Sequence, residues 1–137
     1  MGQTKLDDAI AYFKKALALN PMLLDAHYNM ATSYLLAGNR KQAKDEFGIV
    51  LQQKPFDMAT LFHLGTLSEN SGDYKSAGAY YARMLSIDPQ DRAALRNLAL
   101  LHCRIGGVAM CRRELRFFLD GAPPGEPDED IRRFLAL

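Results

Sequence analysis

The side chains that could perform acid–base, nucleophilic or metal chemistry are few: three histidines and two cysteines. His27, His63 and His102 occupy three different positions of the 34-residue repeat described below, so they point in different directions. Because zinc ligands must converge to about 2.0–2.1 Å from the ion, we expect no metal site. His102 and Cys103 are neighbours, and neighbours on a helix lie about 100° apart, which keeps this base away from this thiol.

Short sequence motifs give no further evidence of catalytic activity. The chain contains no GxSxG, HExxH, P-loop or GxGxxG spacing, and Gly106-Gly107 belongs to a turn between helices. The sequence therefore predicts a chain that is not an enzyme and that holds no cofactor.

The two cysteines, Cys103 and Cys111, are too few for a disulfide framework and lack a CxxC spacing, which favours a reducing compartment. Cys111 falls in a column of small residues, so we predict a buried free thiol there. No apolar run reaches the roughly 18 to 20 residues that cross a bilayer, and the first residues lack a signal-peptide layout. We expect no membrane insertion and a cytoplasmic location.

Length and charge narrow the possibilities further. The chain has 137 residues, 48% of them hydrophobic, which suits one domain with a real core. Seventeen basic and sixteen acidic residues leave a net charge of +1, so nothing in the global balance points to a nucleic acid.

The elements that position these side chains repeat along the chain. Five columns of similar residues recur at a step of 34 and agree on one register. The columns are Pro21, Pro55 and Pro89; Gly38, Gly72 and Gly106; Phe13, Phe47, Tyr81 and Leu115; Ala9, Ala43, Ala77 and Cys111; and Met30, Leu64 and Leu98.

Each unit reads as two amphipathic helices. In the first full unit, apolar or small residues at positions 27, 30, 31 and 34 follow the i, i+3, i+4, i+7 spacing of one helical face. Glycine then suits the left-handed residue that ends the first helix, and Asn39 or Asp73 is placed to cap the second. A proline ends that second helix, and Asp57 or Asp91 is placed to cap the next one.

This pattern resembles the tetratricopeptide repeat (TPR) over nearly the whole chain, from about residue 6 to residue 123. The signature tryptophan of the first helix is replaced by His27, Leu61 and Leu95. The resemblance implies an all-α fold: a right-handed superhelical solenoid of antiparallel helix pairs. It divides a single domain into a half-repeat helix at 4–20, full repeats at 24–57, 58–91 and 92–125, and a capping helix at 128–137. The half-repeat lacks its own first helix, so we interpret the chain as a fragment of a larger TPR protein.

In such a superhelix the first helices line one concave groove, which is the expected peptide-binding site. The residues that face this groove, off the core face, are predicted from their columns. They are Tyr28, Asn29, Thr32 and Leu35 in the first full repeat; Phe62, His63, Thr66, Glu69 and Asn70 in the second; and Arg96, Asn97, Leu100 and Arg104 in the third.

Two columns of the groove suggest how it would hold a peptide. Asn29, His63 and Asn97 share one column, and an amide can donate to and accept from an extended backbone. This column is similar to the asparagine ladder of O-linked N-acetylglucosamine transferases, with His63 as the departure. Tyr28 and Phe62 form an apolar entry in the next column that ends in a basic residue. Solvated amides are the alternative interpretation of the first column.

Charge is uneven along the chain. Residues 92–116 contain six arginines and one acid, so this segment carries +5. Arg96 and Arg104 are predicted to receive acidic groups of a partner. The alternative is that the acidic stretch at 120–130 simply neutralises the basic unit. The carboxylate clamp of TPR co-chaperones is disfavoured, because Tyr28, Thr32 and Ala93 stand at its lysine and asparagine positions.

The sequence thus predicts a non-catalytic scaffold that binds a protein or peptide partner, with acidic residues, in its concave groove. One alternative is a substrate-recruiting TPR domain of a larger enzyme, such as a glycosyltransferase or methyltransferase. Another is a self-association module, a homodimer formed through the N-terminal half-repeat, on which Ile10, Phe13 and Leu17 are expected to be exposed.

Overall fold

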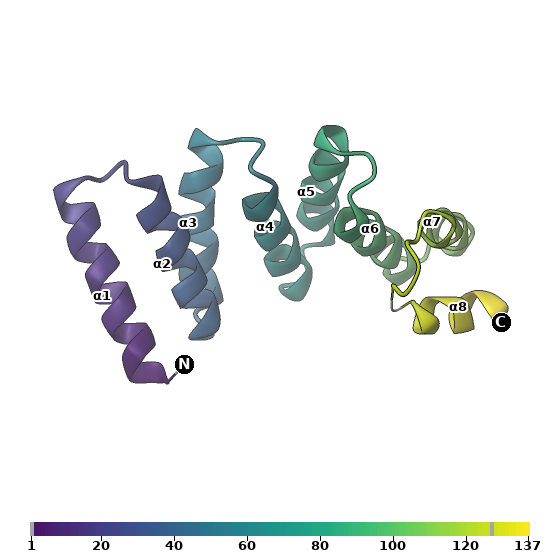
Figure 1. Ribbon diagram of the computed structural model, residues 1–137, viewed down its shortest axis with the longest axis horizontal. Helices are drawn as coiled ribbons and strands as arrows, with labels where there is room; N and C mark the ends of the chain where they lie inside the picture. The colour runs from purple at the N-terminus through teal and green to yellow at the C-terminus, as the bar shows by residue number, and fades with distance from the viewer. Residues whose placement is uncertain (1, 127) are drawn as a thin grey trace.

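The computed structural model describes residues 2–126 and 128–137, and within these ranges the chain forms only helices. The helices are α1 (Gln3–Leu19), α2 (Leu24–Leu36), α3 (Arg40–Gln53), α4 (Met58–Asn70), α5 (Tyr74–Ile87), α6 (Arg92–Arg104), α7 (Val108–Asp120) and α8 (Glu129–Ala136). They follow one another as an arch with the termini at opposite ends (Figure 1). The predicted all-α solenoid of helix pairs is confirmed.

The helix ends follow from the turn residues. Gly38, Gly72 and Gly106 have φ angles of 82°, 83° and 97°, in the left-handed region that a side chain disfavours. Asp57 and Asp73 accept hydrogen bonds from backbone N–H groups in the first turns of α4 and α5, and the other predicted aspartate cap behaves likewise.

The cap predicted at Asn39 is wrong, because its side chain makes no capping hydrogen bond to α3. The first turn of α3 instead relies on backbone contacts, including the bond from the Ala43 N–H to the Asn39 carbonyl.

The core is built from the repeating columns, as three buried clusters that follow one another along the chain. Phe47, Tyr81 and Leu115 each lie almost fully buried at the centre of one cluster. The small residue opposite each of them allows close helix packing. In the middle cluster that residue is Gly65, where an added Cβ would lie 2.5 Å from Cε1 of Tyr81.

Helix α1 packs against α2 and buries its own apolar stripe. Leu6 and Ile10 are 4% and 7% exposed, so the predicted exposure of Ile10 is wrong. Phe13 and Leu17, which were also predicted to be exposed, are half-buried. Helix α1 contacts α2, while Tyr12 and Leu19 remain exposed. The predicted homodimer through this half-repeat stays a prediction.

His27 stands where the resemblance places tryptophan. Its Nδ1 lies 2.6 Å from Oε2 of Glu46, and its Nε2 lies 2.8 Å from the carbonyl oxygen of Pro21. Both ring nitrogens are therefore within hydrogen-bonding distance of an oxygen atom. The polar ring thus ties α2 to α3 and to the turn before α2.

The segment after α7 is held by Arg92, the first residue of α6. Its guanidinium donates two hydrogen bonds to Glu126 and one to the carbonyl oxygen of Phe118, and it lies 3.7 Å from the centre of the Phe118 ring. These contacts tie the segment after α7 to α6, and α8 packs against α7. Within the described ranges, no helix combines the length and apolar character that crossing a membrane requires.

Candidate functional site: the concave groove

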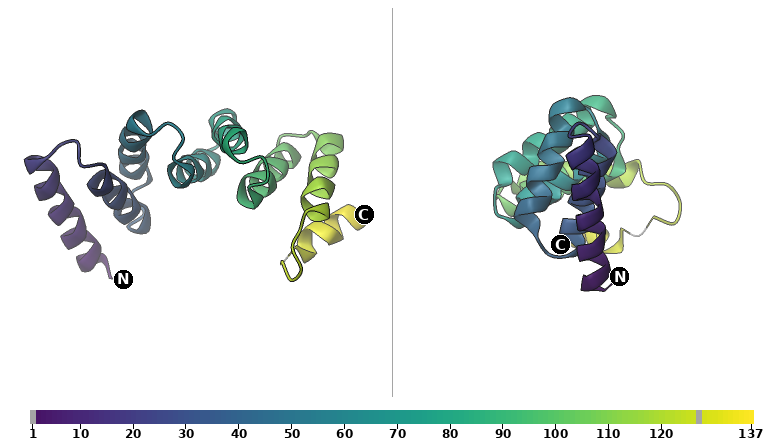
Figure 2. Two further views of the ribbon diagram at one scale, coloured as in Figure 1. Left: turned by 45° about the horizontal axis from the view of Figure 1, so that its top comes forward. Right: turned by 90° about the vertical axis from the view of Figure 1, so that its left-hand side faces the viewer.

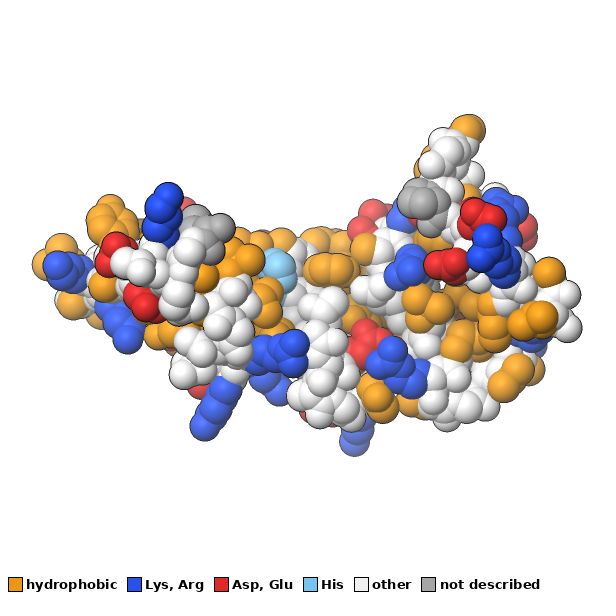
Figure 3. Space-filling model, turned by 90° about the horizontal axis from the view of Figure 1, so that it is seen from below, with side chains coloured by type: hydrophobic (Ala, Val, Ile, Leu, Met, Phe, Trp, Pro, Cys, Tyr) orange, Lys and Arg blue, Asp and Glu red, His pale blue; other side chains and the backbone are white. Residues whose placement is uncertain are grey.

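The concave face is formed by the first helix of each pair. Figure 2 shows α2, α4 and α6 on the inner side of the arch, with α3 and α5 on its outer side. Seen from below, hydrophobic side chains gather in the middle of this face, and charged side chains cluster near its C-terminal end (Figure 3). Three hollows lie along this face, and the first two share Ala59 as a lining residue.

The first hollow lies between α2 and α4 and has a volume of about 190 Å³. Tyr28 lines it together with Asp25, Asp57 and Lys54. Burial raises the pKa of the Tyr28 hydroxyl, and the nearby carboxylate of Asp57 adds to the shift. The phenol therefore stays protonated and can donate a hydrogen bond at the edge of this acidic hollow.

The middle hollow lies between α4 and α6, with a volume of about 290 Å³ and a largely apolar wall. Phe62 and His63 line it, together with Met58 and Met84. The imidazole of His63 stacks on Phe47, with ring centres 4.7 Å apart and planes 12° from parallel. Burial lowers the pKa of His63, which favours the neutral, apolar ring form that suits this wall.

His63 connects the two aromatic groove residues. Its ring centre lies 6.0 Å from that of Tyr28 and 6.1 Å from that of Phe62, in edge-to-face arrangements. The histidine, which we assigned to an amide column, therefore belongs to an aromatic platform. The expected amide ladder is interrupted at this point, because the ring faces Phe47.

The third hollow, of about 230 Å³, lies between α6 and α8. Arg96, Leu100 and Cys103 line it from α6, facing Ile131 and Phe134 of α8. Leu100 packs against the buried cluster to which Ile131 belongs. Arg96 and Phe62 therefore line different hollows of this face.

Several predicted groove residues already have partners within the chain. The hydroxyl groups of Thr32 and Thr66 donate to carbonyl oxygens three residues earlier in their own helices. Glu69 accepts a hydrogen bond of 3.2 Å from Tyr81, and burial and this carboxylate raise the pKa of the Tyr81 hydroxyl. Leu35 is half-buried against the first cluster. These four residues therefore already make contacts that stabilise the fold.

The amides of the groove differ in their surroundings. Asn29 and Asn70 are exposed, so their donors and acceptors can bind another molecule. Asn97 is half-buried, and its side chain hydrogen-bonds to the hydroxyl of Tyr81, which partly offsets the rise in the pKa of that hydroxyl.

The arginines of the basic segment divide into two groups. Arg92 is paired with Glu126, which supports the neutralisation alternative for that residue. Arg96 and Arg104 form no ion pair in residues 2–126 and 128–137, and Arg104 lies 5.7 Å from the centre of the Tyr74 ring. These two guanidinium groups keep their charge available at the C-terminal end of the groove.

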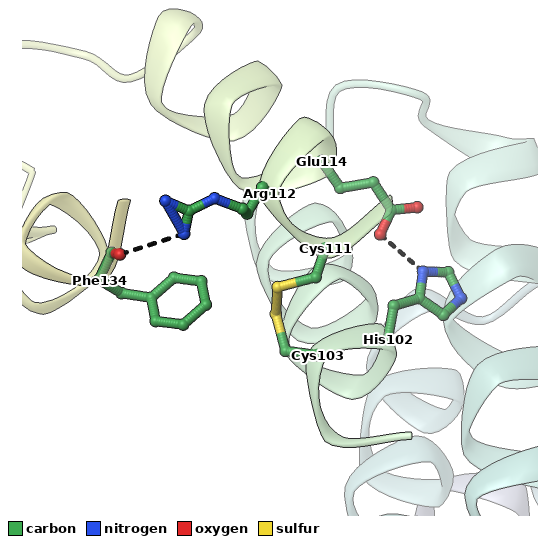
Figure 4. The surroundings of a disulfide bond; sticks show 6 residues. All are labelled: His102, Cys103, Cys111, Arg112, Glu114 and Phe134. Atoms are coloured by element: carbon green, nitrogen blue, oxygen red, sulfur yellow. Dashed lines mark hydrogen bonds and ion pairs between the residues drawn. A yellow bond between two sulfur atoms is a disulfide. The ribbon is translucent and has the colours of Figure 1, made fainter. Parts of the chain in front are cut away.

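The free thiol predicted at Cys111 is wrong. Cys111 is fully buried, but it is joined to Cys103 by a disulfide that connects α7 to α6 (Figure 4). The turn at Gly106-Gly107 brings the two cysteines together, with Cα atoms 4.9 Å apart. Because both cysteines are in this bond, they no longer support a reducing compartment. The cytoplasmic location stays a prediction.

His102 points away from the disulfide. Its Nδ1 lies 2.6 Å from Oε2 of Glu114 on α7, so the imidazole and the sulfur of Cys103 serve different contacts (Figure 4). Within the described residues, no group of three or more histidine, cysteine, aspartate or glutamate side chains is arranged to hold a metal ion.

One hollow escaped the sequence analysis. It lies outside the groove, between α5 and α7, with about 240 Å³ floored by Leu85, Leu95 and Leu98 and edged by Glu114 and Phe117. The repeat pattern indicates why this hollow forms. Tyr80 packs against the core clusters, whereas the residue 34 positions later is Glu114. The side chain of Glu114 contacts His102 and leaves the space unfilled.

Comparisons with known proteins agree with this architecture. Two tetratricopeptide repeat models match in succession, over residues 1–64 and 59–91. The probable biofilm formation methyltransferase WspC of Pseudomonas putida is 32% identical over 105 residues, which cover 71% of this chain and 25% of that protein. The chain spans between 16% and 51% of the length of the curated relatives that it matches.

Solved structures share the fold. A tetratricopeptide repeat protein of Parabacteroides merdae matches with a TM-score of 0.84 at 20% identity, covering 97% of this chain and 52% of that one. YrrB, a TPR protein with an unusual peptide-binding site, matches with a TM-score of 0.77 at 23% identity, covering 91% and 64%. This chain belongs to the tetratricopeptide repeat family, whose domains generally serve as protein-interaction modules.

Proposed function

We propose that this chain binds a segment of a partner protein in its concave groove, with an apolar side chain seated in the middle hollow. The single observation that carries this proposal is the wall of Met58, Phe62, His63 and Met84 around about 290 Å³ of open space. Apolar hollows rimmed by aromatic rings are the usual anchoring points of interfaces. Acidic groups of the partner would meet Arg96 and Arg104 farther along.

The polarity of the groove supports one orientation of the partner. The first hollow is lined by Asp25, Asp57 and Lys54, while the α6 end of the groove carries Arg96, opposite Asp130, and the exposed Arg104. Complementary charges set register and speed association more than they add affinity. The partner segment would therefore carry its acidic residues on the side that faces α6.

A peptide-display library selected on the whole chain tests the proposal. We expect enriched peptides with one large apolar residue, and at least tenfold weaker binding of these peptides to Phe62→Ser. The control is Phe56→Ser, which changes an exposed phenylalanine in the turn before α4. Equal binding to wild type and Phe62→Ser, or a failure to enrich any peptide, would refute the middle hollow as the anchor.

The charge assignment needs its own pair of variants. Arg96→Ser with Arg104→Ser should weaken the same peptides at low salt, with a smaller loss at high salt. Arg40→Ser with Arg83→Ser removes two charges from exposed positions on α3 and α5 and serves as the charge-matched control. A loss that is the same in both variants would assign the effect to net charge rather than to the groove.

Recruitment of a substrate to an enzyme is a second candidate, because one relative is a probable methyltransferase of which this chain covers a quarter. In that case the catalytic groups would lie outside these residues, and the groove would hold the enzyme's substrate or regulator. The full open reading frame that contains these residues decides the question: an adjacent catalytic domain supports recruitment, and a frame without one refutes it.

A further inference from the structure

The hollow between α5 and α7, which we call the outer hollow, lies outside the groove. We propose that it is a second docking site, which takes an acidic segment of a partner protein and holds one aromatic side chain of that segment. The site uses none of the residues assigned to the groove, so this inference goes beyond the proposed function.

The preceding repeat shows what fills such a space. Leu64, 34 positions before Leu98, is only 2% exposed, and Tyr80 packs against the cluster to which Leu64 belongs. In the third repeat Glu114 stands in place of that tyrosine, and Leu95 and Leu98 are half-buried. The missing ring leaves about 240 Å³ open above an apolar floor. An aromatic side chain from another molecule therefore suits this space.

Phe117 on α7 forms the rim of the outer hollow and is 55% exposed. The residue 34 positions earlier is Arg83, so the repeat does not require an apolar side chain at this position. An exposed aromatic ring beside an open apolar floor is typical of the anchoring points of interfaces. A ring inserted into the hollow would lie against Phe117 and remove apolar surface of both from water.

Two arginines of α7 give the outer hollow a preference for acidic partners. Arg113 lines the hollow, and Arg116 lies on the same helix beside Phe117 in an adjoining hollow. Both are exposed, and within residues 2–126 and 128–137 neither forms an ion pair. The residues 34 positions earlier are alanines, so the repeat does not need these charges. Guanidinium groups without a partner bind carboxylates strongly.

The acidic groups beside the arginines do not cancel this preference. Glu114 also lines the outer hollow, but its Oε2 lies 2.6 Å from Nδ1 of His102 on α6. Asp120 lines the adjoining hollow, of about 540 Å³, together with three arginines. One of these, Arg112, keeps its charge while it donates to backbone carbonyl groups of α8. Carboxylates of a partner would therefore meet an excess of positive charge.

Further helices of a solenoid leave this face open. The walls and floor of the outer hollow come from α5, α6 and α7. On α5, the positions that correspond to Arg113 and Arg116 are Ala79 and Ala82, and both are exposed although α6 and α7 follow them. The stacking of another helix pair therefore does not cover the two arginines.

A random peptide library displayed on phage tests the proposal with the whole chain. The library is first depleted on Phe117→Ser and then selected on wild type, which removes peptides that bind the groove. We expect the enriched peptides to combine one Phe, Tyr or Trp with flanking Asp or Glu residues. Their binding should shift the backbone amide signals of Leu98 and Arg113 in NMR spectra.

Filling the hollow is the sharpest variant. Glu114→Tyr places in the third repeat the side chain that the preceding repeat uses, and it should weaken the selected peptides about tenfold or more. Glu114→Gln is the matched control, because it removes the carboxylate and leaves the hollow open. It should bind the peptides at least as well as wild type does. Circular dichroism checks that both variants keep their helices.

The charge preference has its own pair of variants. Arg113→Ser/Arg116→Ser should weaken the selected peptides several-fold at low salt and less at high salt. Arg40→Ser/Lys41→Ser removes two exposed cations of α3 and is the control. An equal loss in both pairs would assign binding to net charge and overturn the site. If Glu114→Tyr loses its helices, this pair decides in its place.

Three further results would overturn the inference: no peptide enriched after depletion, equal binding by wild type and a folded Glu114→Tyr chain, or displacement of the peptides by polyphosphate alone with no effect of replacing their aromatic residue by alanine. The last result would identify α7 as a general polyanion surface. None of these results bears on the middle hollow. Phe62→Ser should leave the selected peptides bound, and loss of the Phe62 effect on groove peptides leaves the outer hollow standing.

Discussion

The second and third full repeats share one register, yet they present opposite surfaces to the groove. The second repeat leaves an apolar hollow open beside Phe62 and His63, and its core closes over Tyr81 only because Gly65 lacks a side chain. In the third repeat a disulfide joins α6 to α7, Arg92 binds Glu126, and α8 packs against α7 and lines the hollow beside α6. The same helix pair can therefore leave an apolar hollow open or be cross-linked and braced by other residues, depending on a few positions outside the repeat pattern.

The largest effect should come from overpacking the second repeat. Gly65→Ala places a Cβ 2.5 Å from the Tyr81 ring, which is fully buried and cannot retreat. We expect a loss of about 3 kcal/mol in the free energy of unfolding, measured by urea denaturation.

Gly48→Ala is the matched control for this change. No atom lies within 4 Å of the added Cβ, so the same substitution in α3 should stabilise the chain by about 1 kcal/mol. A neutral result for Gly65→Ala would mean that the Tyr81 ring has room to move.

The third repeat should respond to reduction. The disulfide closes a short loop, with its cysteines eight positions apart, and reducing it should lower the free energy of unfolding by about 2.5 kcal/mol. The double variant Cys103→Ala/Cys111→Ala should lose a similar amount and no longer respond to dithiothreitol. A wild-type chain that ignores the reductant would contradict the covalent link between α6 and α7.

The contacts of Arg92 should contribute less to the free energy of unfolding. Arg92→Ala removes the ion pair with Glu126 and leaves the carbonyl oxygen of Phe118 without its donor. We expect a loss of about 1.5 kcal/mol in a thermal or urea unfolding experiment. Arg83→Ala, on an exposed face of α5, should change stability by less than about 0.5 kcal/mol. Equal effects of the two variants would show that the contacts of Arg92 do not stabilise the fold.

The smallest effect concerns pH and the second repeat. Burial lowers the pKa of His63, so below the unfolded value of about 6.5 the unfolded chain binds more protons at this residue than the folded chain does. The free energy of unfolding should therefore fall as the pH drops from about 6.5 toward the lower folded pKa. The slope for this one group cannot exceed about 1.4 kcal/mol per pH unit.

His63→Gln isolates this contribution, because the other titrating groups are unchanged. The difference in unfolding free energy between wild type and His63→Gln should shrink as the pH is lowered from 7 to 5. A constant difference would show that the imidazole titrates alike in the folded and unfolded chains.

Much of the fold could be predicted because it is a local property repeated in register. The 34-residue step, the glycine turns and the aspartate caps each involve residues within one or two helical turns, and their side chains do the same work in each copy. The prediction at Asn39 failed on a local detail of side-chain direction. The exposure predicted for Ile10 failed because it assumed a missing neighbour, whereas α2 already covers that stripe.

The groove was harder to predict than the helices. Column analysis placed Tyr28, Phe62 and His63 on one face, but not the stacking of His63 on Phe47 that joins them into a platform. The same analysis predicted a free thiol at Cys111 and missed its disulfide to Cys103, because it followed columns along the solenoid rather than contacts across a turn. Contacts between unlike columns depend on side-chain size and rotamer, which a repeat pattern does not encode.

The sequence by itself determined the helix pairs, their register and the set of residues available to the inner face, since periodicity and turn chemistry act over short distances. Only the tertiary structure decided where hollows open along this face and that α8 lines the one beside α6. Packing between helices fixes those features, because each depends on which side chains from distant positions fill a shared volume and which leave it empty.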